Sequence, residues 1–154
     1  MTTTISNADD TIDSRDVIER LEELTAERDA AQDRFDECTE AYSFCNSAGT
    51  EEGPEWDELQ TARDDLNTWL GENGDELAAL QSLAEQGEQY APDWACGEQL
   101  IRDSYFEQAM DEMVADCYEL PKDLPFWMTV TYDYDALRQD YTEIDFDGVA
   151  YLIR

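Results

Sequence analysis

Apolar residues in the first half of the chain recur at alternating steps of four and three positions, which is the heptad spacing of a coiled-coil seam. Asp13 stands where it can cap a helix, and Ile12 and Val17 are spaced to pack across it as a hydrophobic staple. These features predict a first helix from about Asp13 to Cys45. Its seam, which only Arg28 interrupts, consists of Val17, Leu21, Leu24, Ala31, Phe35, Cys38, Tyr42 and Cys45.

A returning helix is predicted after a turn at residues 46–54, because this segment contains two glycines and Pro54 suits the first position of a helix. We expect Gly71 and Gly74 to break the helix, which then resumes from Asp75 to about Gln89. The seam spacing continues at Trp56, Leu59, Leu66 and Leu70.

From Tyr90 the chain is richer in aromatic and β-branched residues. A strand is expected at residues 126–132, and a short helix at residues 135–141. Asp147-Gly148 separates two alternating apolar runs, 142–146 and 149–153, which is a strong signal for a β-hairpin with a type I′ turn. Before these elements we predict a helix from Asp103 to Cys117, with a core face of Phe106, Met110, Met113 and Val114.

The predicted fold class is α+β and mainly helical. A long N-terminal antiparallel helical hairpin, coiled-coil-like in its spacing, is followed by a small α+β unit that ends in a β-hairpin. We divide the chain into a disordered N-terminus at residues 1–12, the helical hairpin at residues 13–89 and the α+β unit at residues 90–154. The abundance of aromatic residues argues against disorder of the whole chain.

Charge adds a second pattern, since the chain contains forty acidic residues and only nine basic ones, and the formal net charge is −31. On the first predicted helix the acids lie opposite the seam, whereas Arg20, Arg28 and Arg34 lie on or beside it. The acids of the returning helix also point away from the seam. These candidate partner-binding residues are Asp16, Glu19, Glu22, Glu23, Asp29, Asp33, Asp36, Glu37 and Glu40 on the first helix, and Asp57, Glu58, Asp64 and Asp65 on the second.

No catalytic chemistry is predicted, because the chain has no histidine, no glycine-rich phosphate loop and no cysteine nucleophile with a neighbouring base. The four cysteines fit reduced, packed thiols better than a zinc site. The aspartates at positions 133, 135, 145 and 147 do not match the spacing of a calcium-binding loop. We therefore expect a protein that is not an enzyme, with no cofactor and no metal.

The composition also limits the class of partner. No run approaches the ~18 apolar residues of a membrane span, and the first ten residues lack the basic start and apolar stretch of a secretory leader. We expect a cytoplasmic protein that binds neither nucleic acid nor membrane, since a surface this negative repels both. Basic proteins are the expected partners.

The acidic faces have three interpretations. An ordinary solvated coiled-coil face predicts mixed signs, which these faces lack. The second interpretation is that the acids are an adaptation to high salt. The third is that they imitate a nucleic acid. Eleven acids between Asp13 and Glu40 give about one carboxylate per 3.7 Å at a rise of ~1.5 Å per residue. A DNA strand carries one phosphate per ~3.4 Å, so the densities are similar.

The stretch from Tyr105 onward resembles the C-terminal domain of ArdA-type antirestriction proteins. In that family a proline-containing loop leads to a motif like D-Y-x-A-x-x-R-D-L, and residues 133–141 here read D-Y-D-A-L-R-Q-D-Y. The matching residues are Asp133, Tyr134, Ala136 and Asp140. Gln139 takes the place of the family's arginine, and Tyr141 takes the place of its leucine. The resemblance covers about one third of the chain.

The resemblance implies a phage- or plasmid-borne DNA mimic that acts as a dimer and occupies the DNA groove of restriction–modification enzymes in the host cytoplasm. A helical hairpin replaces the family's two preceding domains, so another basic groove, such as that of a CRISPR effector, is also a possible target. A structural role is the other interpretation of the motif, in which a short helix packs Tyr134 and Leu137 onto its neighbours.

We therefore expect an acidic DNA-mimic inhibitor of a host DNA-binding defence complex, antirestriction or anti-CRISPR, that can form a homodimer. The alternative is an acidic coiled-coil adaptor or structural protein whose charge serves solubility or high-salt adaptation. A third interpretation is a Ca²⁺ or Mg²⁺ buffer, which should take up metal stoichiometrically and gain stability from it. Heptad spacing leaves open whether the hairpin seam closes within one chain or between two.

Overall fold

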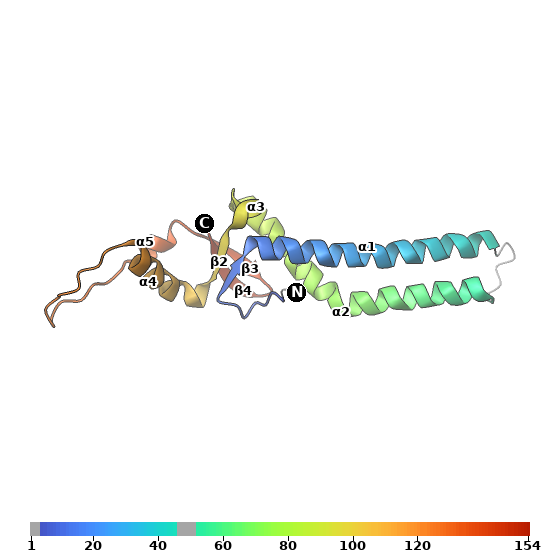
Figure 1. The fold of residues 1–154 in the computed structure, drawn as a ribbon, viewed down its shortest axis with the longest axis horizontal. Coiled ribbons are helices and arrows are strands. Elements are labelled where there is room, and N and C mark those ends of the chain that lie inside the picture. Colours follow the sequence, from blue (N-terminus) through green and yellow to red (C-terminus); the bar gives the residue numbers. More distant parts are fainter. Residues whose placement is uncertain (1–3, 46–51) are drawn as a thin grey trace. The chain divides into compact units, whose positions relative to one another are not determined.

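The computed structural model describes residues 4–45 and 52–154, and these form an α+β fold that is mainly helical (Figure 1). The chain divides into two compact units. One, here called the sheet unit, contains the residues up to Ile18 together with Ser82–Arg154. The other, here called the hairpin unit, is Glu19–Gln81. The predicted fold class is confirmed, with a boundary between units that falls inside both long helices.

Helix α1 runs from Ser14 to Cys45, close to the predicted bounds. It begins there because Asp13 caps it: the Asp13 Oδ1 accepts a hydrogen bond from the Arg15 backbone N at 2.9 Å. Ile12 and Val17, the predicted staple, are both buried. Of the predicted turn at residues 46–54, residues 46–51 lie outside the described part of the chain.

Helix α2 runs without interruption from Pro54 to Tyr90. Pro54 occupies the first helical position, as predicted. The expected break at Gly71 and Gly74 is wrong. Each glycine costs a helix about 1 kcal/mol relative to alanine, and the packing of the flanking turns outweighs that cost. Leu77 and Leu80, directly after the two glycines, are 5% and 0% exposed.

The buried face of α2 differs in one position from the predicted seam. Leu59 and Leu66 are buried, but Leu70 is 42% exposed. Ala62, at 1% exposed, and the half-buried Trp69 lie on the contact face instead. Alanine carries little hydrophobic signal in a sequence, so the correct seam is hard to recognise.

Along α1, the burial of the seam side chains decreases from Leu24, which is fully buried, toward the C-terminal end of the helix. Ala31, Phe35 and Cys38 further along the predicted seam are only half-buried. Near the far end of the hairpin, the rings of Tyr42 and Trp56 meet at a centroid distance of 5.3 Å. In this part of the hairpin each helix is covered by one other helix only. The edges of the seam therefore remain open to water, and its side chains are only partly buried.

The sheet unit is built on four antiparallel strands in the order β1-β2-β4-β3. They are β1 Thr11–Asp13, β2 Gln99–Arg102, β3 Thr142–Phe146 and β4 Val149–Ile153. The predicted terminal hairpin is confirmed. Asp147 and Gly148 both have positive φ, 50° and 79°, as a type I′ turn requires. Strands β1 and β2 were not predicted, because they are three and four residues long.

The predicted disorder of residues 1–12 does not hold for the described residues of that segment. Strand β1 pairs Ile12 with Leu100 of β2, and both side chains are buried. The Arg102 backbone N donates a hydrogen bond to the Asp10 carbonyl at 2.9 Å, and the Tyr151 hydroxyl donates one to the Asp9 carbonyl at 2.6 Å. A polar, acidic segment is therefore held as an edge strand by partners that are all more than eighty residues away in sequence.

Three short or medium helices complete the sheet unit: α3 Trp94–Gly97, α4 Phe106–Cys117 and α5 Tyr134–Arg138, with a 3₁₀ turn at Asp103–Tyr105 before α4. Phe106 and Met110 of α4 form a buried cluster with Ile101 and Leu152 of the sheet. Tyr134 and Leu137 pack against this cluster from outside. Met113 and Val114 of the predicted core face are half-buried.

The predicted strand at residues 126–132 is wrong, since the structure places neither helix nor strand between Cys117 and Tyr134. Alternating β-prone residues gave the signal, but among the described residues no neighbouring strand pairs with them. Phe126 is 99% exposed and Trp127 is 68% exposed. A strand needs both hydrogen-bond partners and a face to bury, and this segment has neither.

Candidate functional site

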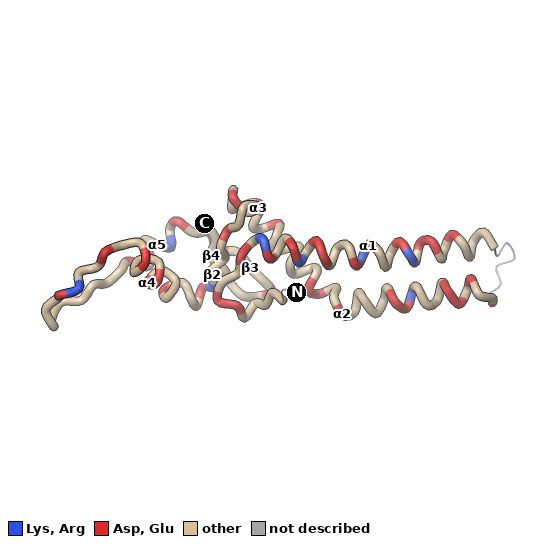
Figure 2. The backbone as a smooth tube through the Cα atoms, viewed as in Figure 1, with Lys and Arg blue, Asp and Glu red and all other residues tan. Residues whose placement is uncertain are grey.

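The acidic residues of α1 lie on the side of the helix that faces away from the seam. At about 100° per residue, the nine predicted acids cover an arc of about 160° centred opposite the seam. Seven of the nine are exposed, whereas Asp16 and Glu23 are half-buried. Figure 2 shows acidic positions recurring along the whole of α1, with few basic ones between them.

The four predicted acids of α2 are also exposed, but they divide between two directions. By helical position, Asp57 and Asp64 lie opposite the buried face that contains Leu59, whereas Glu58 and Asp65 lie on its flank. The acidic surface of α2 is therefore less uniform than that of α1.

Arginine side chains connect the two helices along one flank of the seam. The Arg20 guanidinium binds Glu76 with two hydrogen bonds, Nε to Oε1 at 2.8 Å and Nη2 to Oε2 at 3.1 Å. This bidentate contact is the main cause of the raised pKa of Arg20, and an additional bond to Glu23 on the same helix contributes. The Arg20 side chain is only 13% exposed, so the pair is partly shielded from solvent.

Along this flank of α1, a residue that contacts α2 recurs every seven positions, as heptad spacing requires. Glu27 accepts a hydrogen bond from the Trp69 indole Nε1 at 3.0 Å, and the Arg34 Nη1 donates to Asp65 Oδ2 at 2.8 Å. Both contacts join α1 to α2. These flank residues hold the two helices in register, which is a structural use of charge.

Ion pairs therefore divide the thirteen predicted acids into two groups. Glu23, Asp29, Asp64 and Asp65 are each paired with an arginine, so part of their charge is neutralised. The other nine have no ion pair within the part of the chain that the structure describes. They are Asp16, Glu19, Glu22, Asp33, Asp36, Glu37, Glu40, Asp57 and Glu58.

The motif residues of the ArdA resemblance belong to the sheet unit and surround α5. Asp133 caps this helix, since its Oδ1 accepts a hydrogen bond from the Ala136 backbone N at 3.0 Å. The Tyr134 hydroxyl donates to Asp111 Oδ1 of α4 at 2.6 Å, and this bond is the main cause that raises the pKa of Tyr134 to about 12. Asp140 follows the helix and is exposed. Capping and docking of α5 thus account for Asp133, Tyr134 and Ala136.

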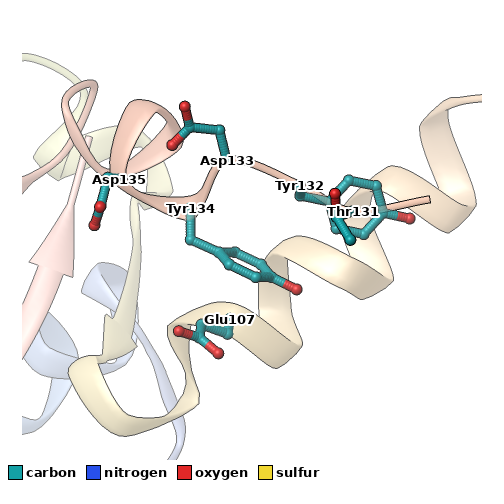
Figure 3. Close-up of a pocket in the computed structure, with 6 residues that line it drawn as sticks. All are labelled: Glu107, Thr131, Tyr132, Asp133, Tyr134 and Asp135. Carbon is teal, nitrogen blue, oxygen red and sulfur yellow. The ribbon is translucent and has the colours of Figure 1, made fainter. Parts of the chain in front are cut away.

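A shallow hollow of about 530 Å³ lies beside α5, and Figure 3 shows the residues around it. Its polar groups are carboxylates and the hydroxyls of tyrosine and threonine, and no histidine, cysteine, lysine or arginine lines it. The residues are Glu107, Thr131, Tyr132, Asp133, Tyr134 and Asp135.

Other classes of site find little support in the geometry. Within residues 4–45 and 52–154, no group of three or more His, Cys, Asp or Glu side chains is arranged to hold a metal ion. The four cysteines are free, and three of them are exposed. None of the helices in the described ranges combines the length and apolarity needed to cross a membrane.

One surface feature was missed from the sequence. The segment between α4 and α5, residues 118–133, carries large apolar side chains that are turned toward solvent. Tyr118 and Trp127 are more than half exposed, and Phe126 is almost completely so. The available signal was the run of nine uncharged residues, 124–132, in a chain this acidic, with Pro121 and Pro125 before and within it.

Comparison of the chain with protein families, with curated proteins and with solved structures finds no match. The resemblance to ArdA-type proteins therefore remains a prediction that rests on the motif residues alone.

Proposed function

We propose that this protein is a non-enzymatic inhibitor that imitates the phosphate backbone of DNA and blocks the basic DNA groove of a host defence complex. The target would be a restriction–modification enzyme or a CRISPR effector. The observation that carries the proposal is the group of nine exposed or half-exposed acids without ion pairs, seven of them on one arc of α1.

The physical basis is the release of counterions. A DNA-binding protein gains much of its affinity by replacing condensed cations around phosphates with its own arginine and lysine side chains. A row of carboxylates on a helix offers these side chains the same kind of partner. Of the acids without an ion pair, Glu22, Asp33, Asp36 and Glu40 lie within about 60° of one another around α1. Since the helix is already formed, few degrees of freedom are lost when the partner binds.

The test reverses the charge of four outer acids of α1, Glu19, Glu22, Asp33 and Asp36, to lysine. The expected result is loss of competition between the protein and a labelled DNA duplex for a purified type I restriction enzyme or a Cas9-type effector, measured by fluorescence anisotropy. Far-UV circular dichroism should remain unchanged, because all four side chains are exposed. A variant that still competes as well as the original protein would refute the proposal.

The matched control reverses four exposed acids of the sheet unit, Glu85, Glu88, Asp116 and Glu143, to lysine. This variant has the same net charge as the first, so it separates a defined surface from a general effect of charge. The control variant should compete almost as well as the original protein. Competition by the original protein should also weaken by at least about ten-fold between ~50 mM and ~200 mM salt.

The alternative, an acidic adaptor or salt-adapted protein, predicts different behaviour in two measurements. Its partner binding would depend little on salt, because apolar contacts would carry it. A salt-adapted protein would also unfold in dilute buffer, where its carboxylates repel one another most strongly.

A further inference from the structure

The segment that joins α4 to α5, residues 118–133, combines exposed aromatic side chains with a groove at its base. We call residues 118–133 the arm. Within the described chain, the Met128 backbone N donates to the Pro125 carbonyl at 2.9 Å, and the other backbone hydrogen bonds of the arm lie at its two ends, from Tyr118 N to the Val114 carbonyl at 2.9 Å and from Leu137 N to the Asp133 carbonyl at 3.1 Å. Phe126, Trp127, Met128 and Val130 are all more than 40% exposed. Large aromatic side chains of this kind can each remove about 150–250 Å² from water when they are covered.

The groove lies between the C-terminal half of α4, the base of the arm and α5. It has a volume of about 690 Å³, within the range of known ligand pockets. Met113 and Leu137 line it, and both also pack against the buried cluster of Ile101, Phe106, Met110 and Leu152. The floor of the groove is therefore supported by the core of the sheet unit. Val114, Leu120 and Ala136 add further apolar surface.

The charged residues of the groove all have the same sign. Glu119, Asp133 and Asp140 line it, and no basic residue does. Lys122 of the arm is exposed and does not line the groove, and Arg138 is paired with Asp103 and packs over the ring of Phe106. The apolar lining is thus accompanied by three carboxylates without an arginine beside them in the groove.

We propose that the arm and the groove form a docking site for a basic segment of another protein, one that presents a large apolar side chain between arginines or lysines. The apolar side chain would occupy the groove beside Tyr118 and Tyr132, the aromatic residues of the arm that line it, while its cationic neighbours meet Glu119, Asp133 and Asp140. Charge complementarity selects this occupant over a second copy of the chain, since two copies each with a net charge of −31 repel one another.

This docking site lies in the sheet unit and does not require that the acidic face of α1 imitate DNA. Its test uses the full-length protein and three labelled peptides of equal length. The first alternates arginine with leucine, the second arginine with serine, and the third glutamate with leucine. By fluorescence anisotropy at about 150 mM salt, where exposed charges more than ~8 Å apart are screened, the arginine–leucine peptide should bind at least about ten-fold more tightly than either control.

Two variants assign the binding to the arm. The double change Tyr118→Ser and Leu120→Ser, at two positions that line the groove, should reduce the preference for leucine over serine to less than about two-fold, with unchanged circular dichroism, because neither side chain belongs to the buried core. The α1 variant with Glu19, Glu22, Asp33 and Asp36 changed to lysine should keep the preference. That variant therefore distinguishes failure of the docking site from failure of the proposed function.

Three results would overturn the docking site. One is equal binding of the arginine–leucine and arginine–serine peptides, which would mean that charge alone attracts them. Another is an unchanged preference in the double-serine variant. The third is sedimentation of the original protein as a dimer that the double-serine change converts to a monomer, because the arm would then be covered by a second copy.

Discussion

The contact between Gly87 and Trp94 gives the sharpest test of the packing in the sheet unit. Gly87 lies in the last turn of α2, and the indole ring of Trp94 lies directly over its backbone. A Cβ placed at Gly87 would lie 2.3 Å from the Trp94 Cε3 and Cζ3 atoms and 2.6 Å from Cη2. Ordinary contacts between carbon atoms are about 3.5–4.0 Å. Glycine is therefore required here because the ring occupies the space of a side chain.

Trp94 cannot easily move away, since it is only 3% exposed and its backbone is fixed on both sides. Its carbonyl accepts a hydrogen bond from the buried Ser14 Oγ at 2.7 Å, and its N–H donates to the Ala91 carbonyl at 3.2 Å. Overpacking a core of this kind costs about 1–3 kcal/mol. Alanine recovers about 0.5–1 kcal/mol in helix propensity. The clash is severe, so Gly87→Ala should destabilise the protein by about 1–2 kcal/mol.

Gly74 is the matched control on the same helix, because nothing lies within 4 Å of a Cβ placed there. Gly74→Ala should stabilise the protein by about 0.5–1 kcal/mol through propensity alone. In urea denaturation followed by circular dichroism and tryptophan fluorescence, the midpoints of the two variants should differ by roughly 1 M. Equal effects of the two substitutions would refute the contact between Trp94 and α2.

A double-mutant cycle isolates the ring itself. Trp94→Leu removes all three ring atoms that the added Cβ would meet. In that background the cost of Gly87→Ala should fall by at least about 1 kcal/mol, since the coupling between touching residues is of this order. A cost that stays the same in both backgrounds would assign the effect of Gly87→Ala to something other than Trp94.

Three further predictions follow from single contacts. Ser14→Ala removes a fully buried hydroxyl that donates to the Trp94 carbonyl and accepts from the Glu98 N–H, each at 2.7 Å, so it should cost about 1–3 kcal/mol in urea denaturation. Asp13→Ala should cost about 1 kcal/mol at neutral pH. The Arg15 side chain, and then its backbone N–H, hold the pKa of Asp13 below its ordinary 3.8, so the cap stabilises the fold above that pH. The difference between Asp13→Ala and the original protein should therefore shrink as the pH falls below 3.8. Tyr134 should titrate at about 12 by NMR, and Asp111→Asn should bring its pKa back toward 10.0.

The helical hairpin could be predicted because its signals are local and repeated. Eight apolar positions in the heptad pattern predicted α1, and Asp13 and Pro54 marked where the two helices begin. The error at Gly71 and Gly74 came from treating a small local cost as decisive. Burial of Leu77 and Leu80 in the next turns outweighs it, and that burial depends on a partner helix distant in sequence.

The sheet could be predicted only where its pairing is local. The β3–β4 hairpin has the Asp147-Gly148 turn as its own signal. Strands β1 and β2 are short, and they pair across more than eighty residues of sequence, so no window of the sequence contains both partners. The predicted strand at residues 126–132 failed for the opposite reason, because β-prone residues alone do not provide a neighbour to pair with.

The candidate site could likewise be predicted only in part. Helical periodicity placed the acids of α1 on one outward face, and their exposure agrees with that placement. Periodicity could not tell which acids have an arginine partner. Asp65 was grouped with the outward acids, yet Arg34 reaches it from the other helix at 2.8 Å. Pairing between helices depends on their register, which the sequence of either helix alone does not contain.

The placement of arginines explains how a hairpin this acidic can remain folded and still present free carboxylates. Residues 19–81 contain nineteen acids and only four arginines, and two of those arginines, Arg20 and Arg34, are used between the helices. Each of these pairs stabilises the seam where the helices touch, and seven of the nine acids on the outward arc of α1 have no ion pair within the described residues. If the same arginines stood on the outer face, they would relieve repulsion there through i,i+4 pairs but would no longer connect α1 to α2. The repulsion that remains is between solvent-exposed groups, so added salt screens it, and the hairpin gains stability under the same conditions that weaken binding to a basic partner.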